Sequence, residues 1–190
     1  MKLKNETLSK NFLIYGFGKS GISSLKYLKK KNRCFIFDDD KKKIKNKYKK
    51  FFISKSKLFK NNFDYIVISP GININRCQLS NYLKKNQKKV ITDFDIFYKF
   101  NPEVLTITIT GTNGKSTTSK LLYDILKKHN YDTRLTGNIG NPILEEKKVT
   151  RNTIFVIEAS SYQLAYSKYF KSKFSIIINI SPDHLERHNT

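Results

Sequence analysis

The amino-acid sequence predicts an α/β fold with parallel sheets, in which a Rossmann-like unit is followed by a P-loop-type unit. Short apolar stretches typical of strands alternate with helical patterns, and parallel sheets are the usual product of that alternation. A glycine-rich turn follows the first apolar stretch, and a second one, which contains a lysine, follows a strand-like stretch near the middle of the chain. Because the residue before a proline disfavours helix, we place a boundary at Asn101-Pro102 and expect domains of residues 1–101 and 102–190.

The first unit is expected to begin as a strand, a glycine turn, a helix and a second strand. The helix is indicated by Ile22, Leu25 and Leu28, which are spaced three apart as on one helix face. Residues 41–62 are rich in lysine and show only weak periodicity. The elements expected in this unit are strands at 11–15, 34–37, 65–68 and 90–91 and helices at 20–30, 78–86 and 94–100.

The second unit is expected to begin with the run LTITIT, whose β-branched residues are typical of a strand. The helix that follows carries four apolar residues on one side, namely Leu121, Leu122, Ile125 and Leu126. The elements expected here are strands at 105–110, 132–135, 153–158 and 174–180 and a helix at 116–129. We expect the last of these strands to leave an exposed edge on the sheet.

The charge balance is strongly basic, with 37 Lys and Arg against 15 Asp and Glu and a net charge of +22 over 190 residues. Such a balance invites a nucleic-acid hypothesis. However, the lysines lie in short runs at predicted turns and helix ends, and arginine, the preferred reader of bases, is scarce. We therefore expect no nucleic-acid partner, although the field favours the approach of small anions.

Cysteine content and the absence of apolar segments bear on location. Cys34 and Cys77 are too few for a disulfide framework or a four-thiolate metal site, and reduced thiols are typical of cytosolic proteins. The first ten residues lack the apolar core of a secretory signal, and no apolar run approaches the roughly 20 residues of a membrane helix. We expect a cytoplasmic monomer with no membrane partner.

The first glycine-rich turn is Gly16-x-Gly18-x-x-Gly21. Glycines at this spacing permit a tight turn and close backbone approach, and the helix that follows offers N–H groups to a diphosphate. Asp38 comes 17 residues after Gly21, near the position that binds a ribose in dinucleotide folds. The pattern predicts a nucleotide site. The alternative is a turn that only packs the helix against the strand.

The second glycine-rich turn predicts an ATP site. Its backbone N–H groups would surround phosphate oxygens, its lysine would neutralise their charge and its serine hydroxyl would hold Mg²⁺. The general P-loop has a glycine where this chain has Ile109, so the match to that pattern is incomplete. The residues expected to bind ATP are Gly111, Thr112, Asn113, Gly114, Lys115, Ser116 and Thr117.

Two further motifs come at the ends of predicted strands. Glu158 in EASSYQL is placed to bind Mg²⁺, although an acid beside a serine helix cap is an equally good interpretation. His184 in NISPDHLERH is a candidate metal or substrate ligand whose tautomer Asp183 could fix, although a surface histidine is the simpler interpretation. Open α/β sheets bind ligands at these strand ends, which favours the functional interpretation of both motifs.

Taken together, these motifs make the whole chain resemble the N-terminal part of the Mur ligase family, the ATP-dependent enzymes of peptidoglycan and cell-wall synthesis. The SPGI and GNIG elements are similar to those of the members that add D-glutamate, and a sister ligase for another amino acid is the alternative. The resemblance rests on an ordered series of motifs: GFGKSG from residue 16, SPGI from 69, TGTNGKSTT from 110, TGNIGNP from 136, EASSYQL from 158 and NISPDHLERH from 179.

The resemblance implies a site for each ligand. The first domain would bind the UDP group of UDP-N-acetylmuramoyl-L-alanine, and the central domain would bind ATP and Mg²⁺. The residues implied for the UDP substrate are Phe17, Lys19, Ser20, Asp38, Asp39, Gly71, Asn138, Ser160 and Gln163. The residues implied for Mg²⁺ are Ser116, Glu158 and His184, the catalytic ones are Lys115 and His184, and Asp183 and Arg187 would have supporting roles.

The reaction implied is ATP-driven amide formation by an acid–amino-acid ligase. The alanine carboxylate takes the γ-phosphate and becomes an acyl phosphate, the amine of D-glutamate attacks, and phosphate leaves. Because a carboxylate and a triphosphate repel each other, Lys115 and two Mg²⁺ ions are needed to bring them together. Members of the family are considerably longer, so we expect an incomplete central domain, no C-terminal domain and no turnover by this chain alone.

Two other functions compete with the ligase. An NAD-dependent oxidoreductase is suggested by the first glycine turn and Asp38, but it leaves the lysine-containing turn unexplained. A non-catalytic nucleic-acid binder rests on the net charge alone. The sequence therefore favours the ligase.

Overall fold

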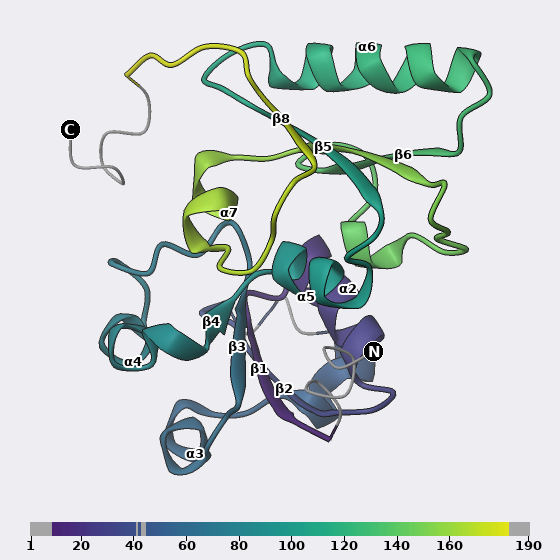
Figure 1. Cartoon of the computed structure of the whole chain (residues 1–190). Helices are drawn as coiled ribbons and strands as arrows, with labels where there is room; N and C mark the ends of the chain where they lie inside the picture. The colour runs from purple at the N-terminus through teal and green to yellow at the C-terminus, as the bar shows by residue number, and fades with distance from the viewer. Residues whose placement is uncertain (1–8, 41, 43–44, 183–190) are drawn as a thin grey trace.

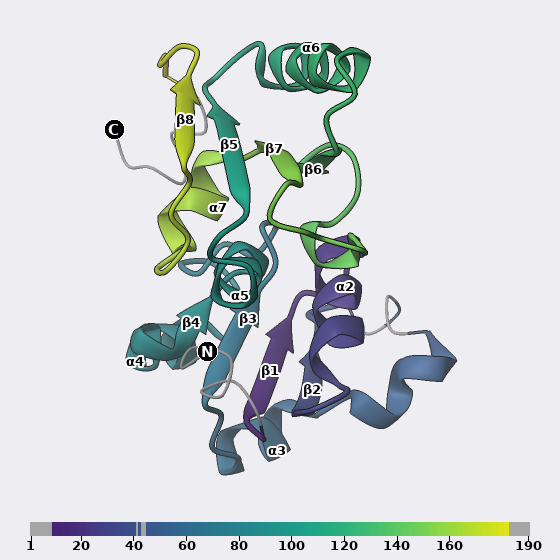
Figure 2. The same ribbon diagram turned by 45° about the vertical axis from the view of Figure 1, so that its right-hand side comes forward.

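A computed structural model describes residues 9–40, 42 and 45–182 of the chain. It is an α/β fold with two four-stranded sheets, and every strand pair in both sheets is parallel. The predicted fold class is therefore confirmed. In Figures 1 and 2 the two sheets lie one above the other, with helix α5 (Asp93–Phe100) between them.

The first sheet has the strand order β2-β1-β3-β4. The chain passes from β1 to β2 on one side and then returns to place β3 on the other side of β1, so the switch point lies between β1 and β3. Ligands of open α/β sheets bind outside the carboxyl ends of the strands at such a point.

The strands of the first sheet are β1 (Asn11–Tyr15), β2 (Arg33–Phe37), β3 (Tyr65–Ile68) and β4 (Val90–Ile91). The helices before α5 are α2 (Lys19–Leu28), the 3-10 helix η2 (Asn46–Phe51), α3 (Lys55–Lys60), α4 (Ser80–Lys85) and the 3-10 turn η3 (Gln87–Lys89).

Both faces of the first sheet are buried, as the continuous apolar strands require. Phe12 and Ile14 of β1 join a core cluster that includes Leu25 of α2. Leu13 and Tyr15 point to the opposite face and join a second cluster. Alternate residues of one strand thus supply two cores, which explains why the sequence shows an unbroken apolar run here rather than an alternating one.

The second sheet has the strand order β6-β7-β5-β8. Helix α6 lies across one face of it, as Figure 1 shows. The strands are β5 (Leu105–Thr110), β6 (Thr133–Gly137), β7 (Ile154–Glu158) and β8 (Phe174–Ile177). The helices are α6 (Lys115–Lys128), the 3-10 turn η4 (Ile143–Glu145) and α7 (Ser161–Tyr166).

The burial of this sheet differs sharply between its strands. All five residues of β7 are buried, whereas all four residues of β8 are exposed. Within the described part of the chain, β8 pairs with β5 on one side and forms the edge of the sheet. The predicted exposed edge is confirmed, although the strand ends at Ile177 rather than Ile180 because the chain turns towards the loop after β5.

Helix α6 has the predicted extent within one residue, but its apolar side is only partly buried. Leu121 is 59% exposed and Ile125 is 47% exposed, and Ser119 is the one buried residue of the helix. An amphipathic pattern indicates the face that can be covered, and tertiary structure decides whether it is. The four apolar residues that share one side of this helix are half-buried (Leu122 and Leu126) or exposed (Leu121 and Ile125).

The two sheets share one core through helix α5. The ring of Phe97 lies 4.6 Å from that of Phe155 in β7, centroid to centroid. The buried Asp95 carboxylate adds polar contacts, because its Oδ1 accepts the backbone N–H groups of residues 168–170 at 2.6–3.0 Å. Three hydrogen bonds to one carboxylate fix the chain between α7 and β8 against the end of the first unit.

Other expectations can be compared with the structure directly. The strands at 11–15, 65–68, 90–91 and 105–110 have the predicted bounds, and the remaining strands differ at their ends. The lysine-rich stretch 41–62 contains η2 and α3, which the weak periodicity did not predict. Cys34 and Cys77 are free thiols, and burial raises the pKa of the Cys34 thiol to about 12. No described helix is long and apolar enough to cross a membrane.

Candidate functional site

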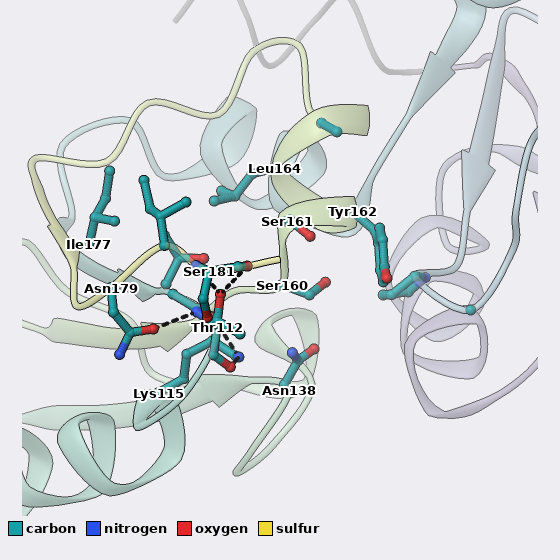
Figure 3. A pocket seen from close by; sticks show the side chains of 16 residues that line it. Thr112, Lys115, Asn138, Ser160, Ser161, Tyr162, Leu164, Ile177, Asn179 and Ser181 are labelled. Carbon is teal, nitrogen blue, oxygen red and sulfur yellow. Dashed lines mark hydrogen bonds between the residues drawn. The ribbon is translucent and has the colours of Figure 1, made fainter. Parts of the chain in front are cut away.

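The carboxyl ends of strands from both sheets open onto one pocket of about 950 Å³ (Figure 3). Pro70 and Gly71, which follow β3, reach it from the first sheet, while Asn138 after β6, Ser160 after β7 and Asn179 after β8 reach it from the second. Residues far apart in the sequence are thus brought together where the topology places a ligand. The other lining residues are Thr110, Gly111, Thr112, Lys115, Ser161, Tyr162, Leu164, Ala165, Ile177, Ile180 and Ser181.

The lysine-containing turn, which we call the second glycine loop (residues 111–117), connects β5 directly to α6. Gly111 has φ of +147° and Gly114 has φ of +82°, both in the region that favours glycine. Gly114 is the N-cap of α6, and no side chain at this position accepts the first N–H groups of the helix. The first N–H groups of a helix lack intrahelical acceptors, so this loop presents donors and the positive end of the helix dipole to an anion.

Lys115 is folded back over the second glycine loop. Its Nζ donates hydrogen bonds to the carbonyl oxygens of Gly111 at 2.6 Å and Thr112 at 2.7 Å. The side chain is half-buried and lines the pocket. The ammonium group is therefore already positioned at the mouth of the loop, where it can exchange carbonyl partners for phosphate oxygens.

Asn179 contacts the second glycine loop, and the motifs of the sequence did not predict this contact. Its Oδ1 accepts the backbone N–H groups of Thr112 and Asn113, both at 3.0 Å, and its Nδ2 donates to the Asn113 carbonyl at 3.1 Å. Ser181 adds a reciprocal pair, since the Thr112 hydroxyl donates to its carbonyl and its N–H donates to that hydroxyl, both at 3.1 Å. A polar residue just past a strand that borders β5 was the signal that could have found Asn179.

Glu158, the last residue of β7, is 4% exposed. Its Oε2 is buried and has no hydrogen-bond partner in the part of the chain that the structure describes. A buried carboxylate oxygen without a partner is costly unless a ligand satisfies it. Carboxylate and hydroxyl oxygens are ligands that Mg²⁺ prefers, so the donor chemistry of Glu158 and of the exposed Ser116 hydroxyl suits a magnesium ion.

The interpretation of Glu158 as an acid beside a serine helix cap is confirmed as far as the serine is concerned. Ser160 caps α7, and Ser160 and Gln163 form a reciprocal capping box. Gln163 is buried, and its side-chain oxygen accepts the Ser160 N–H at 3.0 Å. Asn138 lies beside Glu158 because its N–H donates to the Glu158 carbonyl at 3.0 Å. Asn138 and Ser160 both line the pocket.

The first glycine loop (residues 16–21) is packed far more tightly than the second. A Cβ atom at Gly21 would lie 2.1 Å from the Gly16 carbonyl oxygen, and one at Gly16 would meet Ser69 at 2.8 Å. The Ser69 hydroxyl also donates to that same carbonyl at 2.6 Å. These contacts join the loop after β1 to the loop after β3, which are the two sides of the switch point.

The predicted acids of the first unit are engaged by the protein itself. Asp38 is 6% exposed and accepts the Phe17 N–H at 2.6 Å and the Asp40 N–H at 2.8 Å. Asp39 accepts the Tyr15 hydroxyl, whose pKa burial raises, so that the hydroxyl stays a donor. Asp38 therefore holds the glycine loop and has little surface left for a ribose. A contact of either acid with a ligand stays a prediction.

The other predicted residues of this loop differ in exposure. Phe17 is buried and packs edge-on against Tyr48 with ring centroids 5.1 Å apart. Lys19 is exposed at the start of α2, and Ser20 is half-buried. The Ser20 hydroxyl donates to the buried Asp93 at 2.6 Å, and burial raises the pKa of that carboxyl. Lys19 thus remains as the side chain of the loop that is open to a ligand from outside.

His184, Asp183 and Arg187 lie outside the described residues, so their predicted roles have no structural outcome. Within the residues that are described, no three His, Cys, Asp or Glu side chains gather as a metal cluster. Of the three residues predicted to bind magnesium, Glu158 and Ser116 lie within the described part of the chain.

The fold and the second glycine loop define the P-loop class of α/β proteins. Residues 109–190 match the Mur ligase middle domain. The chain is 38% identical over 192 residues to UDP-N-acetylmuramoylalanine--D-glutamate ligase of Caldicellulosiruptor bescii, covering 95% of this chain and 42% of that protein. The protein of the same name from Rickettsia bellii is 36% identical over 182 residues, covering 94% and 40%. These matches confirm the resemblance to the Mur ligase family.

A solved structure agrees at the level of the fold. The UDP-N-acetylmuramate:L-alanyl-gamma-D-glutamyl-meso-diaminopimelate ligase from Neisseria meningitides superimposes with a TM-score of 0.56 at 13% sequence identity, covering 94% of this chain and 63% of that chain. The chain spans about two fifths of the length of the sequence relatives named above.

Proposed function

We propose that this chain provides the UDP-substrate and ATP sites of an ATP-dependent ligase that joins D-glutamate to UDP-N-acetylmuramoyl-L-alanine in peptidoglycan synthesis. The names of the sequence relatives specify this substrate and this amino acid. Residues 1–101 would bind the UDP substrate and residues 102–190 would bind ATP. Amide formation would proceed through an acyl phosphate on the alanine carboxylate, which the amine of D-glutamate attacks as phosphate leaves.

One observation carries the proposal: a single pocket contains residues from the strand ends of both sheets. Gly71 follows the switch-point strand β3 of the first sheet, and Lys115 belongs to the second glycine loop. A reaction between a UDP-linked carboxylate and ATP requires the two substrates to meet end to end. A shared pocket of about 950 Å³ is large enough for the reacting ends of two such ligands.

Each located residue has a role that follows from its position. Lys115 neutralises the phosphate charge, and the N–H groups at the start of α6 bind phosphate oxygens. Asn138 contacts the muramoyl-alanine part, while Gly71 lets the substrate approach the backbone, since nothing lies within 4 Å of where its Cβ would be. Lys19 is positioned to meet the diphosphate from outside the first glycine loop.

Glu158 and Ser116 are the described residues that would hold Mg²⁺. The ion would neutralise part of the negative charge and so reduce the repulsion between the carboxylate and the triphosphate. The fit rests on the buried Glu158 Oε2, which has no partner among the described residues and which a cation would satisfy. The predicted ligand His184 and a second ion remain part of this proposal.

Calorimetric titration of the chain with four ligands tests the proposal. Mg-ATP and UDP-N-acetylmuramoyl-L-alanine should each bind, and UDP-N-acetylmuramate, which lacks the alanine, should bind more weakly than the latter. NADH should not bind, because Asp38 is occupied by backbone N–H groups. Binding of NADH in the absence of any Mg-ATP binding would favour the oxidoreductase and overturn the ligase.

A further inference from the structure

We infer that Asn179 is a positioning residue for the ATP loop: it orients the two peptide groups whose carbonyls hold Lys115. This inference rests on the proposed ATP site and assigns a role to a residue outside the predicted ligand set. The observation behind it is that Asn179 and Lys115 contact the same two peptide groups of the second glycine loop from opposite sides.

The geometry is similar at the two peptide groups. In the group that joins Gly111 to Thr112, the carbonyl accepts from Lys115 Nζ at 2.6 Å, and the N–H donates to Asn179 Oδ1 at 3.0 Å and to the Asn179 backbone carbonyl at 3.3 Å. In the group that joins Thr112 to Asn113, the carbonyl accepts from Lys115 at 2.7 Å and the N–H again donates to Asn179 at 3.0 Å. Because the C=O and N–H of a trans peptide point in opposite directions, fixing the N–H also fixes the carbonyl.

Further contacts make Asn179 suited to this role. Its Nδ2 donates to the Asn113 carbonyl, so one side chain engages three consecutive peptide groups. Its backbone lies 3.1–3.2 Å from where a Cβ of Gly111 would be, so a side chain there would crowd the two segments, and the φ of +147° also favours glycine. The loop therefore takes its shape from the segment after β8 as well as from its own glycines.

The consequence is a loop that is preorganised before a ligand arrives. Two of its N–H groups are committed to Asn179, which leaves the donors at the start of α6 for phosphate oxygens. Without the Asn179 side chain, the loop would keep the contacts of Thr112 with the backbone of residues 179 and 181 but lose those at Asn113, and the cost of ordering these peptide groups on binding would reduce affinity. We expect Asn179→Ala to weaken Mg-ATP binding about five- to tenfold.

The test combines two readouts on the full chain. Amide NMR of the ligand-free protein should show that Asn179→Ala shifts the Thr112 and Asn113 resonances and speeds their hydrogen exchange, while residues 16–21 are unchanged. Titration with Mg-ATP then measures the loss of affinity. Asn152→Ala makes the same chemical change at an exposed turn and should alter neither readout.

Asn179→Asp keeps the acceptor oxygen and should keep the slow exchange of both amides; faster exchange in this variant would contradict the role of Oδ1 even if Asn179→Ala does not fold. Unchanged shifts and exchange of Thr112 and Asn113 in Asn179→Ala would overturn the inference. If the wild type binds Mg-ATP, an unchanged Mg-ATP affinity of Asn179→Ala would overturn it as well. If the wild-type chain binds no Mg-ATP, the proposed function fails, and the amide readout still decides whether Asn179 holds the loop.

Discussion

The two glycine loops of this protein share one arrangement, a parallel strand followed by a glycine-rich turn and a helix. They differ in how tightly other atoms pack around the glycine that precedes or begins the helix. The first loop is closed upon itself: Gly21 is packed against the Gly16 carbonyl, and Asp38 takes the Phe17 N–H. In the second loop a Cβ at Gly114 would find its nearest neighbour 3.8 Å away, and Lys115 lines the pocket.

The difference shows that a glycine pattern has two separable meanings. In the first loop the glycines at both ends are required by packing of helix against strand, which is the structural alternative raised from the sequence. In the second loop the glycines shape a backbone that begins α6 beside the pocket, which Lys115 also lines. Replacing matched residues in the two loops can therefore separate stability from binding.

The largest effect is expected for Gly21→Ala. The new Cβ would overlap the Gly16 carbonyl oxygen at 2.1 Å, so the helix must shift, and the free energy of unfolding should fall by about 3 kcal/mol or more. Gly18→Ala is the matched control, since no atom lies within 4 Å of its Cβ and its φ is −79°; it should cost about 1 kcal/mol or less. Urea unfolding measures both, and equal losses would contradict the packing difference.

Lys115→Ala should have the next largest effect, on binding rather than on folding. Removing the ammonium group from the loop should lower the affinity for Mg-ATP about 10- to 100-fold, the range expected for a hydrogen bond to a charged group. Lys19→Ala removes the corresponding lysine at the first glycine loop and should leave the Mg-ATP affinity within about twofold. Calorimetry compares the two, and the loops would not differ in function if Lys19→Ala were the more damaging change.

A smaller effect is expected in the pH dependence of stability. Burial raises the pKa of Asp93, the partner of Ser20 in the first loop, so the folded state binds this proton more tightly than the unfolded state does. The resulting stabilisation is present below the ordinary value of 3.8 and is lost as the pH rises through the raised pKa. Asp93→Asn has no proton to lose, so its stability should fall less than that of the wild type from about pH 4 towards neutrality.

Urea melts at several pH values measure this slope, with Asp124→Asn on the exposed side of α6 as the control. If Asp93→Asn and the wild type lose stability in parallel, the buried carboxyl does not contribute in the way described.

The sequence was most informative where local pattern and burial agree. The strand at 65–68 is apolar because it lies in the middle of a sheet covered on both faces, so its bounds could be predicted. The 3-10 helix η2 was missed because its lysines give no periodic apolar face. Leu121 and Ile125 repeat as on a core-facing helix, but their exposure depends on what packs against α6, which local pattern does not contain.

The same distinction applies to the candidate site. Lys115 and Glu158 could be predicted because their motifs carry the chemistry locally, whereas the contact of Asn179 with Thr112 joins residues 67 apart. The engagement of Asp38 with the Phe17 N–H was also outside the pattern, because a spacing between an acid and a glycine does not say which of several donors the acid will choose. Tertiary geometry decides such contacts.

The central claim is that the two loops serve two ligands, and amide NMR during two titrations tests it most directly. Mg-ATP should shift the resonances of residues 111–117 and leave those of residues 16–21 in place, and UDP-N-acetylmuramoyl-L-alanine should do the opposite. A shift of residues 16–21 by Mg-ATP with no response from residues 111–117 would contradict the account.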